Sequence, residues 1–360
     1  MVIGAEDLHA LIVDILTRAG ASQTNAECVA SHLVGANLCG VDTHGVWQLP
    51  GYVAAIERGE LVPKAVPFLL IDTQTAALIT GNWGFGQVAA IEATQQAVRK
   101  AQHCGVAVVS VVQSHHIGRL GAYAELIARQ RLITIIWASG LGENKPAVVP
   151  YGGRKAVFGT NPIAIGLPTG DESPIVIDFA TSTVSAVKVI DAARKRDLVP
   201  PGWIVDQNGR DTTDPRGIGE KGGLAPFGGH KGYGLMLAIE VLGRIFAGAD
   251  AFVEPPRGGD FFSHQGATMV VVRADLFQPL NDYSELTCEL RERLRAVPPD
   301  VGETCCIDVP GEPEARVRAV REHEGIPLPD DLWETLAALK AHAPASALAV
   351  RSATETGLKV

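Results

Sequence analysis

The stretch at residues 106–112 constrains the fold more than any other part of this 360-residue chain. Its β-branched residues are typical of a buried strand, and the strand pattern stops at Gln113-Ser114. The sequence His-His-Ile-Gly-Arg follows at 115–119, and a helical pattern begins directly at Leu120. A strand that passes into a helix through a short turn predicts a layered α/β fold. Because such sheets bind ligands where their strands end, we predict that His116 is an active-site acid/base.

The alternation of strands and helices continues along most of the chain. We expect strands near residues 76–79, 106–112, 133–138, 175–179 and 268–272, and helices near 87–103, 120–131 and 231–246. Residues 5–36 have the apolar spacing of two amphipathic helices, with cap residues at 22–25 between them. A further helix passes through Tyr52 and Ile56, and two more helical patterns occupy residues 283–296 and 331–342.

Composition and charge exclude several classes of partner. A formal charge of −9 and an isoelectric point near 5.6 leave no basic stripe, so we expect neither nucleic acid nor an anionic membrane surface as a partner. Apolar runs such as residues 133–138 are too short to cross a bilayer, and the acids near the N-terminus are unlike a signal peptide. The six cysteines form no CxxC pair, and Cys305-Cys306 are adjacent. We therefore predict reduced thiols and a cytoplasmic protein.

A dinucleotide-binding signature is present only formally. Residues 217–222 have the GxGxxG spacing, but Asp214-Pro215-Arg216 precede them and no strand leads into them, so we do not expect a Rossmann turn there. Residues 81–86 lie between a strand and a helix with the glycine order reversed, which favours a tight turn. Gly118 and the segment 228–232 each open a helix, the second with a lysine in its first turn. Free N–H groups at these two helix starts predict an anion-binding surface.

Two histidine positions stand out as candidates for catalysis. His44 lies in a loop beside Asp42 and Thr43, partners that fix a tautomer and raise basicity. An Asx or Thr turn with an incidental histidine is the alternative interpretation of that loop. His115 and His116 are consecutive, so we expect only one of them to be catalytic. The sequence holds no HExxH motif and no spaced Cys/His cluster, so we predict no metal site. We assign the helical histidines to solvated faces, namely His9, His32, His103, His323 and His342.

Asp178 lies near the end of the predicted strand at residues 175–179. Its carboxylate can cap the turn that follows at Thr181 and Ser182, or it can bind the hydroxyls of a ribose. The residues alone favour capping.

Six short segments in a fixed order carry a family resemblance. They are VDTHG at 41–45, SHHIGRLG at 114–121, GTNPIAI at 159–165, IDFATS at 177–182, GHKGY at 229–233 and VPGEP at 309–313. Together they resemble the type-2 malate/L-lactate dehydrogenase family, also called the sulfolactate dehydrogenase-like family. That family includes hydroxycarboxylate, ureidoglycolate and diketogulonate dehydrogenases and cyclic imine-carboxylate reductases. Each segment is weak alone, but the ordered set, which spans about residues 5–340, is specific.

The resemblance implies an α/β fold that is peculiar to this family and is not a Rossmann domain, homodimers, and hydride transfer with NAD(P). By position, His116 corresponds to the proton donor and acceptor of hydroxy-acid members, and His44 to the corresponding donor in imine reductases. The implied substrate contacts are Thr43, Gln48, Tyr52, Thr160 and Lys188. The implied cofactor contacts are His116, Ile117, Gly118, Arg119, Leu120, Lys145, Asp178, Phe179, Ala180, Lys231, Pro310, Gly311 and Glu312.

Three residues depart from the family pattern. Thr43 stands where a serine is usual, which keeps the hydroxyl. Gln48 stands where many members have an arginine that grips the substrate carboxylate, so the charge-assisted pair is lost unless Arg119 or Lys188 supplies it. Lys188 occupies the place of a relay aspartate in imine reductases, which argues against that subgroup.

These observations predict an NAD(P)-dependent oxidoreductase that interconverts a 2-hydroxy acid and a 2-oxo acid. His116 is the expected acid/base, and His44 orients or protonates the substrate oxygen. Lys145 lies where family members contact the adenosine ribose, and its charge favours NADP over NAD. Two alternatives stay open: a cyclic imine-carboxylate reductase and a catalytically silent nucleotide-binding homologue.

The expected organisation has four segments. Residues 1–72 form a helical segment with the substrate loop, and residues 73–280 form the α/β NAD(P)-binding core. Residues 281–342 are helices that pack back on the N-terminal part, and residues 343–360 are a loose tail with little periodicity.

Overall fold

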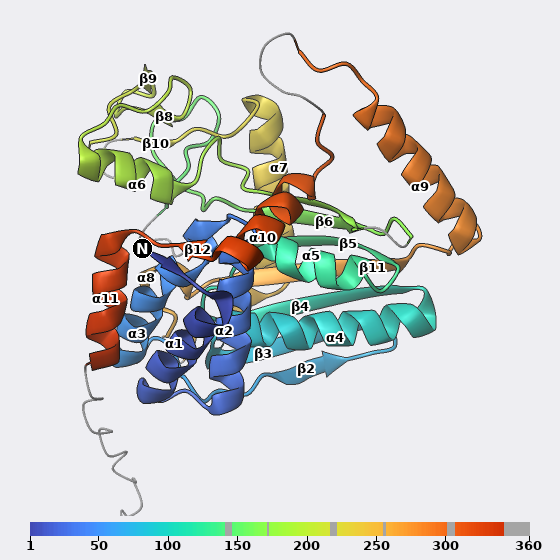
Figure 1. Ribbon diagram of the computed structural model, residues 1–360, viewed down its shortest axis with the longest axis horizontal. Coiled ribbons are helices and arrows are strands. Elements are labelled where there is room, and N and C mark those ends of the chain that lie inside the picture. The colour runs from blue at the N-terminus through green and yellow to red at the C-terminus, as the bar shows by residue number, and fades with distance from the viewer. Residues whose placement is uncertain (141–145, 171–172, 217–221, 255–256, 301–306, 342–360) are drawn as a thin grey trace, which may run out of the picture.

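The computed structural model describes residues 1–140, 146–170, 173–216, 222–254, 257–300 and 307–341. Its centre is a seven-stranded sheet with the strand order β2-β3-β4-β11-β5-β6-β7 (Figure 1). The strands are β2 (Phe68–Asp72), β3 (Ala76–Gly84), β4 (Val106–Ser114), β5 (Leu132–Ser139), β6 (Ile163–Leu167), β7 (Ile175–Phe179) and β11 (Gly266–Arg273).

The sheet is mixed, because only β3 and β4 pair in parallel and every other neighbouring pair is antiparallel. Following the pairing across the sheet, β3, β4, β5 and β7 run in one direction. The end of β4 at Ser114 and the end of β7 at Phe179 therefore lie at the same edge. This edge holds His116 and Asp178.

The strands expected from the sequence are confirmed: the one at 175–179 matches β7, and the other four lie within longer observed strands. Two strands of the seven-stranded sheet were not predicted. β2 is an edge strand whose five residues are all exposed, so it lacks the alternating burial that the sequence pattern reports. β6 follows the turn at residues 159–162, and the sequence pattern indicated only the turn.

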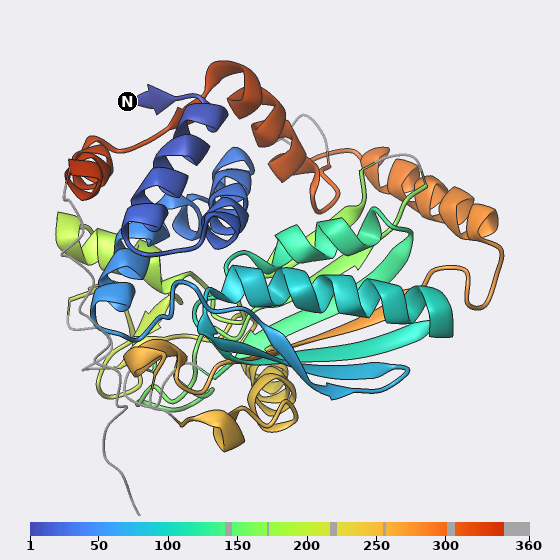
Figure 2. The same ribbon diagram turned by 90° about the horizontal axis from the view of Figure 1, so that it is seen from below.

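Helices cover both faces of the sheet (Figure 2). α4 (Gly86–Cys104) and α5 (Leu120–Ala128) lie on one face, whereas α7 (His230–Glu240) and a π-helical turn, η3 (Val241–Ile245), lie on the other. α4 packs closely on the sheet because its inner face is small. That face is an alanine stripe with no exposed surface: Ala89, Ala90, Ala93, Ala97 and Ala101.

A second core joins the two ends of the chain. α1 (Ala5–Arg18), α2 (Gln23–Leu38), α3 (Leu49–Glu57) and α11 (Asp330–Ala341) pack together, and β1 (Val2–Ile3) pairs with β12 (Ile326–Pro327). Ser22 caps α2, as its sequence predicts, by accepting a hydrogen bond from the N–H of Asn25. The predicted layered α/β fold, with a helical part built from the N- and C-terminal segments, is confirmed.

The other two C-terminal elements lie in different places. α10 (Glu312–Glu324) contacts α2. α9 (Leu280–Arg295) instead reaches the turn between β6 and β7, where the Cys288 thiol lies 3.4 Å from the Thr169 carbonyl oxygen. The expected tail at 343–360 lies outside the described residues.

The remaining described elements form a small lobe beside the main sheet. It consists of α6 (Ala186–Lys195) and a three-stranded sheet of β8 (Ile204–Val205), β9 (Asp211–Thr212) and β10 (Gly223–Leu224). Four short helical turns complete the list: η1 (Asp42–His44), η2 (Val46–Gln48), η4 (Ala249–Phe252) and α8 (Gly259–Phe262).

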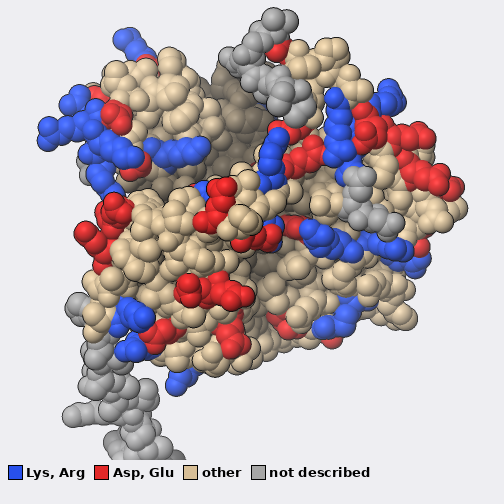
Figure 3. Space-filling model, in the orientation of Figure 1, with Lys and Arg blue, Asp and Glu red and all other residues tan. Residues whose placement is uncertain are grey.

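Two expectations about the chain as a whole concern thiols and membranes. Cys28, Cys39, Cys104 and Cys288 are free thiols, and Cys305 and Cys306 lie outside the described residues. Within the described ranges, no helix combines the length and apolar character needed to cross a bilayer. The face drawn in Figure 3 intersperses cationic and anionic side chains, with Lys and Arg gathered over α6.

Candidate active site

The loop at residues 115–119 joins β4 to α5 and is held from several sides. The His115 N–H donates to the Gly84 carbonyl at 3.0 Å, and the Gln265 side-chain amide donates to the His115 carbonyl at 3.0 Å. α4 begins against this loop, because a Cβ on Gly86 would lie 2.1 Å from the His115 carbonyl oxygen. Tyr123 on α5 donates its hydroxyl to the Ile117 carbonyl at 2.5 Å. The loop is thus a rigid part of the core.

His32 is the histidine that the sequence interpretation placed wrongly. It is buried, and its Nε2 accepts a hydrogen bond from the Arg119 N–H at 2.9 Å. Its ring stacks on Tyr123 with the centroids 5.2 Å apart. Burial lowers the pKa of His32 to about 3, so the ring stays neutral and its Nε2 remains an acceptor. The expected solvated face does not exist at this position, because α2 is covered by the loop at residues 115–119.

The other histidines assigned to solvated faces lie as follows. His103 and His323 are exposed, which confirms that assignment. His9 is partly buried and shares a hydrogen bond with Ser31 at 3.1 Å. His342 lies outside the described residues.

Gly118 is a glycine because of His32. Its φ of +80° lies in the left-handed region, and a Cβ at this position would be 2.2 Å from His32 Nε2. The close approach that Gly118 permits is therefore one between α2 and the loop.

His44 and His116 face each other, although 72 residues separate them in the sequence. Their rings are stacked with the centroids 5.7 Å apart, and both side chains are half-buried. His44 Nδ1 shares a hydrogen bond with the Thr43 hydroxyl at 3.1 Å, and His116 Nδ1 shares one with the Tyr52 hydroxyl at 2.7 Å. His115 is more deeply buried than His116, and its ring lies on Phe262. Of the two consecutive histidines, His116 is the one that pairs with His44.

Both paired histidines are neutral near pH 7. Burial lowers the pKa of His44 to about 4, and the nearby Arg119 guanidinium lowers it further. Burial also holds the pKa of His116 well below its usual value, and the neighbouring His44, His115 and His32 act in the same direction. The pair is therefore uncharged at neutral pH.

Arg119 and Asp178 tie the start of α5 to the end of β7. Asp178 Oδ2 accepts from the Gly121 N–H at 2.7 Å and lies 3.7 Å from Arg119 Nε. Burial raises the pKa of the Asp178 carboxyl, and Arg119 and the Gly121 N–H partly offset that rise. Arg119 is buried, and its Nη1 donates to Cys39 Sγ at 3.2 Å. Asp178 thus caps the first turn of α5 instead of the expected turn at Thr181 and Ser182, and Arg119 is engaged by the protein instead of facing a substrate.

The predicted cofactor residues gather around the end of β7. Phe179 is partly exposed and packs edge-on against Phe227, 5.5 Å away, and the Phe227 N–H donates to the Thr181 carbonyl. The next residues, Gly228 and Gly229, have positive φ and lead into α7, and a Cβ on Gly228 would meet nothing within 4 Å. Lys231 is exposed in the first turn of that helix.

On the other side of β7, the Pro310 carbonyl accepts from the Val176 N–H at 3.1 Å. Gly311 follows, and Glu312 bonds to the Val309 N–H and pairs with Arg295, so its carboxylate is engaged by the protein. Lys145 and residues 217–221 of the GxGxxG segment lie outside the described residues. Residues 81–84 belong to β3, so the tight turn predicted at 81–86 is instead an irregular strand end, with positive φ at Asn82 and Trp83 and a shift of register between Thr80 and Gly84.

These surroundings fit a dinucleotide. The open backbone at Gly228 and the α7 N-terminus with Lys231 suit phosphate groups, and the Phe179 ring offers an apolar surface. Thr160 joins this region, because its carbonyl accepts hydrogen bonds from the N–H and hydroxyl of Thr181 at 2.9 and 3.0 Å.

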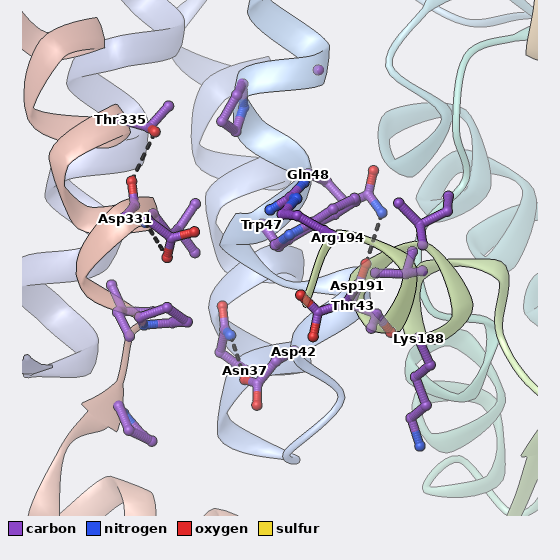
Figure 4. Close-up of a pocket in the computed structure, with 18 of the residues that line it drawn as sticks. Asn37, Asp42, Thr43, Trp47, Gln48, Lys188, Asp191, Arg194, Asp331 and Thr335 are labelled. Atoms are coloured by element: carbon purple, nitrogen blue, oxygen red, sulfur yellow. Dashed lines mark hydrogen bonds between the residues drawn. The ribbon is translucent and has the colours of Figure 1, made fainter. Parts of the chain in front are cut away.

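A cavity of about 930 Å³ lies between the loop that holds Thr43 and helix α6 (Figure 4). Thr43 and Gln48 line one side, and the Gln48 amide donates to the Thr43 carbonyl at 2.7 Å. Lys188 and Arg194 line the opposite side from α6. His44 and His116 are not among the lining residues, so Thr43 connects the cavity to them. The structure thus brings together Thr43, Gln48 and Lys188, three of the substrate contacts that the family resemblance implies.

Two site residues have roles that the sequence interpretation did not anticipate. Tyr52 was expected to contact substrate, yet its hydroxyl is taken by His116 and by Gln87. Arg194 was not singled out at all. The available signal was helical spacing, because Val187, Asp191 and Arg194 fall on one face of α6 and all line the cavity.

Comparison with known proteins identifies the protein family. The family model described as malate/L-lactate dehydrogenase matches residues 3–337, and the chain belongs to this family of hydroxy-acid oxidoreductases. Hydroxycarboxylate dehydrogenase B of Escherichia coli O157:H7 is 35% identical over 335 residues, covering 92% of this chain and 91% of the relative. The structure of sulfolactate dehydrogenase from Methanocaldococcus jannaschii superposes with a TM-score of 0.83 at 31% identity, covering 94% of this chain and 96% of that one.

Another similar protein is named for a different reaction. A Delta(1)-pyrroline-2-carboxylate/Delta(1)-piperideine-2-carboxylate reductase of Pseudomonas putida is 33% identical over 326 residues, covering 89% of this chain and 91% of the relative. Family membership therefore defines the reaction class more firmly than the substrate.

The contact between Gly118 and His32 generates a prediction with a matched control. We expect Gly118→Ala to lower the free energy of unfolding by about 1–3 kcal/mol, because the new Cβ is strained at positive φ and collides with the buried imidazole. Gly35 lies one turn along α2 from His32, and a Cβ there meets nothing within 4 Å. Gly35→Ala should be neutral or stabilising by up to about 1 kcal/mol. Urea unfolding of both variants checks this, and equal effects would contradict it.

Proposed function

We propose that this protein interconverts a 2-hydroxy acid and a 2-oxo acid by hydride transfer with NAD(P). The observation that carries the proposal is the neutral pair His44–His116 near a cavity whose lining includes the cations Lys188 and Arg194. Two of the three lining carboxylates are already in ion pairs, Asp191 with Lys195 and Asp42 with Arg321. An acid/base beside an anion-binding pocket is what reduction of a 2-oxo acid requires.

The proposed chemistry divides between cofactor and protein. When bound, the nicotinamide supplies or accepts the hydride. His116 holds the proton that the substrate oxygen gains in reduction and loses in oxidation. His44, fixed through Nδ1 by Thr43, orients the same oxygen. General acid–base help of this kind is worth roughly 10²–10⁴-fold in rate.

The substrate contacts follow from the cavity. Gln48 offers an amide where an arginine would form a charge-assisted pair, and Arg119 is committed to Cys39 and Asp178. Lys188 and Arg194 are exposed on the cavity side of α6, and within the described ranges no ion pair engages either of them. We therefore assign recognition of the substrate carboxylate to α6.

The finer assignments stay predictions from the sequence. The preference for NADP over NAD rests on Lys145, which lies outside the described residues. Homodimeric assembly and a cytoplasmic location are likewise expected from the family resemblance and the composition.

The direct test of function is oxidation of NADPH and of NADH in the presence of a panel of substrates. The panel holds pyruvate, oxaloacetate, hydroxypyruvate, phenylpyruvate, 2-oxoglutarate, diketogulonate and Δ1-piperideine-2-carboxylate. We expect turnover on at least one 2-oxo acid, abolished in His116→Gln. Turnover on the cyclic imine alone would identify an imine reductase. Cofactor binding in calorimetry without any turnover would identify a silent homologue.

Removing the α6 cation should affect substrate affinity more than turnover. We expect Arg194→Gln to raise the KM for the 2-oxo acid about tenfold and to change kcat by less than about threefold, since a charge-assisted hydrogen bond is worth roughly 1.5–3 kcal/mol. Arg196→Gln is the matched control, because Arg196 lies just beyond α6 and outside the cavity lining. Steady-state kinetics decide, and equal KM values for the two variants would contradict the assignment.

The low pKa of His116 predicts the pH dependence. Free enzyme above pH 6.5 carries a neutral His116, so reduction must take up a proton. The kcat/KM for reduction should therefore fall about tenfold per pH unit above roughly pH 7, whereas kcat/KM for oxidation should be nearly flat there. A pH-independent kcat/KM for reduction between about pH 7 and 9 would contradict this.

A further inference from the structure

A buried hydrogen-bond chain leads away from the candidate acid/base. Gln87, in the first turn of α4, donates from Nε2 to the Tyr52 hydroxyl oxygen at 2.7 Å. The Tyr52 hydroxyl lies 2.7 Å from His116 Nδ1. Gln87 has no exposed surface and Tyr52 is 2% exposed, so water does not compete for these bonds. Neither residue is needed for the substrate contacts proposed above.

Counting protons along the chain determines the tautomer of His116. A phenol has a single proton, and the Gln87 N–H already points at its oxygen. The Tyr52 proton is therefore directed to His116 Nδ1, which acts as the acceptor. A neutral imidazole that accepts at Nδ1 carries its own proton on Nε2. In this state His116 offers a donor to the substrate oxygen.

When His116 is protonated, the direction of donation along this hydrogen-bond chain must reverse. Both ring nitrogens then carry protons, so the Tyr52 oxygen accepts from Nδ1 and its own proton needs a new acceptor. Gln87 Oε1 is buried and has no hydrogen-bond partner among the described residues. Turning the amide by half a rotation brings Oε1 to the Tyr52 hydroxyl and leaves Nε2 as the unpartnered atom. Each orientation leaves one amide atom without a partner, so the amide can turn without a net loss of hydrogen bonds when His116 gains a proton.

Among the described residues, no other group near His116 supports its protonated form. The titratable groups that act on it are His44 from η1, His32 from α2 and His115 from its own loop, and each disfavours an additional cation. Tyr52, from α3, is the side chain that hydrogen-bonds to its ring.

We propose that Gln87 and Tyr52 form a reversible hydrogen-bond chain whose direction follows the protonation state of His116. Gln87 is a positioning residue that acts through Tyr52, and a primary amide suits this role because it carries a donor and an acceptor on one rotor. A role for this hydrogen-bond chain in turnover rests on the proposed function, but the hydrogen-bond chain itself does not.

The test reads the tautomer of His116 in the free enzyme. Ring ¹⁵N shifts of protein labelled with ¹⁵N-histidine, assigned with His116→Gln, distinguish Nε2–H from Nδ1–H. We expect wild type to carry the Nε2 proton. In Gln87→Glu the ionised carboxylate only accepts, so Tyr52 donates to it and accepts from His116, and the neutral ring changes to the Nδ1–H tautomer. The added negative charge alone raises the His116 pKa without exchanging the tautomers.

Further variants show that the effect passes through Tyr52. Tyr52→Phe combined with Gln87→Glu should not give the exchange. Gln87→Met, which is similar in size and has no donor or acceptor of this kind, should give a mixture of tautomers. If Gln87→Glu does not fold, Gln87→Met serves as the test. Gln96→Glu, on the same helix, is the control for added charge and should leave the Nε2–H tautomer unchanged.

The outcomes are separable from those of the functional test. A wild-type Nδ1–H tautomer, or a pure Nε2–H tautomer in both Gln87→Glu and Gln87→Met, would contradict the proposed hydrogen-bond chain. Neither result depends on turnover. Absence of turnover on the whole substrate panel would overturn the proposed function and leave the tautomer assignment intact.

Discussion

The arrangement of the candidate site depends on the hydrogen bond between the Arg119 N–H and His32 Nε2. That bond holds the loop at residues 115–119 against α2, so one helix of the terminal core positions a loop of the central sheet. It needs a neutral imidazole as acceptor, and burial ensures this by lowering the pKa of His32. It also needs Gly118, because any side chain there would occupy the position of the ring.

The same burial shapes the proposed chemistry. His44 and His116 meet across two parts of the chain, and their low pKa values keep the pair uncharged in the free protein. In a site of this kind, binding of an anionic substrate and uptake of a proton are coupled. The anion favours protonation of the histidine, and the protonated histidine favours binding of the anion. The cations that would attract the substrate lie on α6, across the cavity. At that position they do not contact His44 or His116, so they do not directly oppose protonation of the pair.

Much of the fold could be predicted from the sequence, because strand and helix patterns are local. The valine-rich strand β4, the alanine-lined α4 and the capped α2 each carry their signal within a few residues. β2 carried none, since an edge strand that is exposed throughout has no alternation of burial. The site could be predicted in part for another reason. Thr43, Gln48 and Lys188 were found by position in a family pattern, whereas Tyr52 and Arg194 have partners that no local pattern reports.

The sequence by itself determined the alternation of strands and helices, the turn that carries His116, and the family to which the chain belongs. These depend on residue type, spacing and order, which are properties of the linear chain. Only the tertiary structure decided that His32 is buried, that Arg119 faces the protein interior, and that Tyr52 bonds to His116 and Gln87. The reason is physical. Burial and hydrogen-bond partners are set by segments distant in the chain, and the same residue type is solvated or buried according to what packs against it.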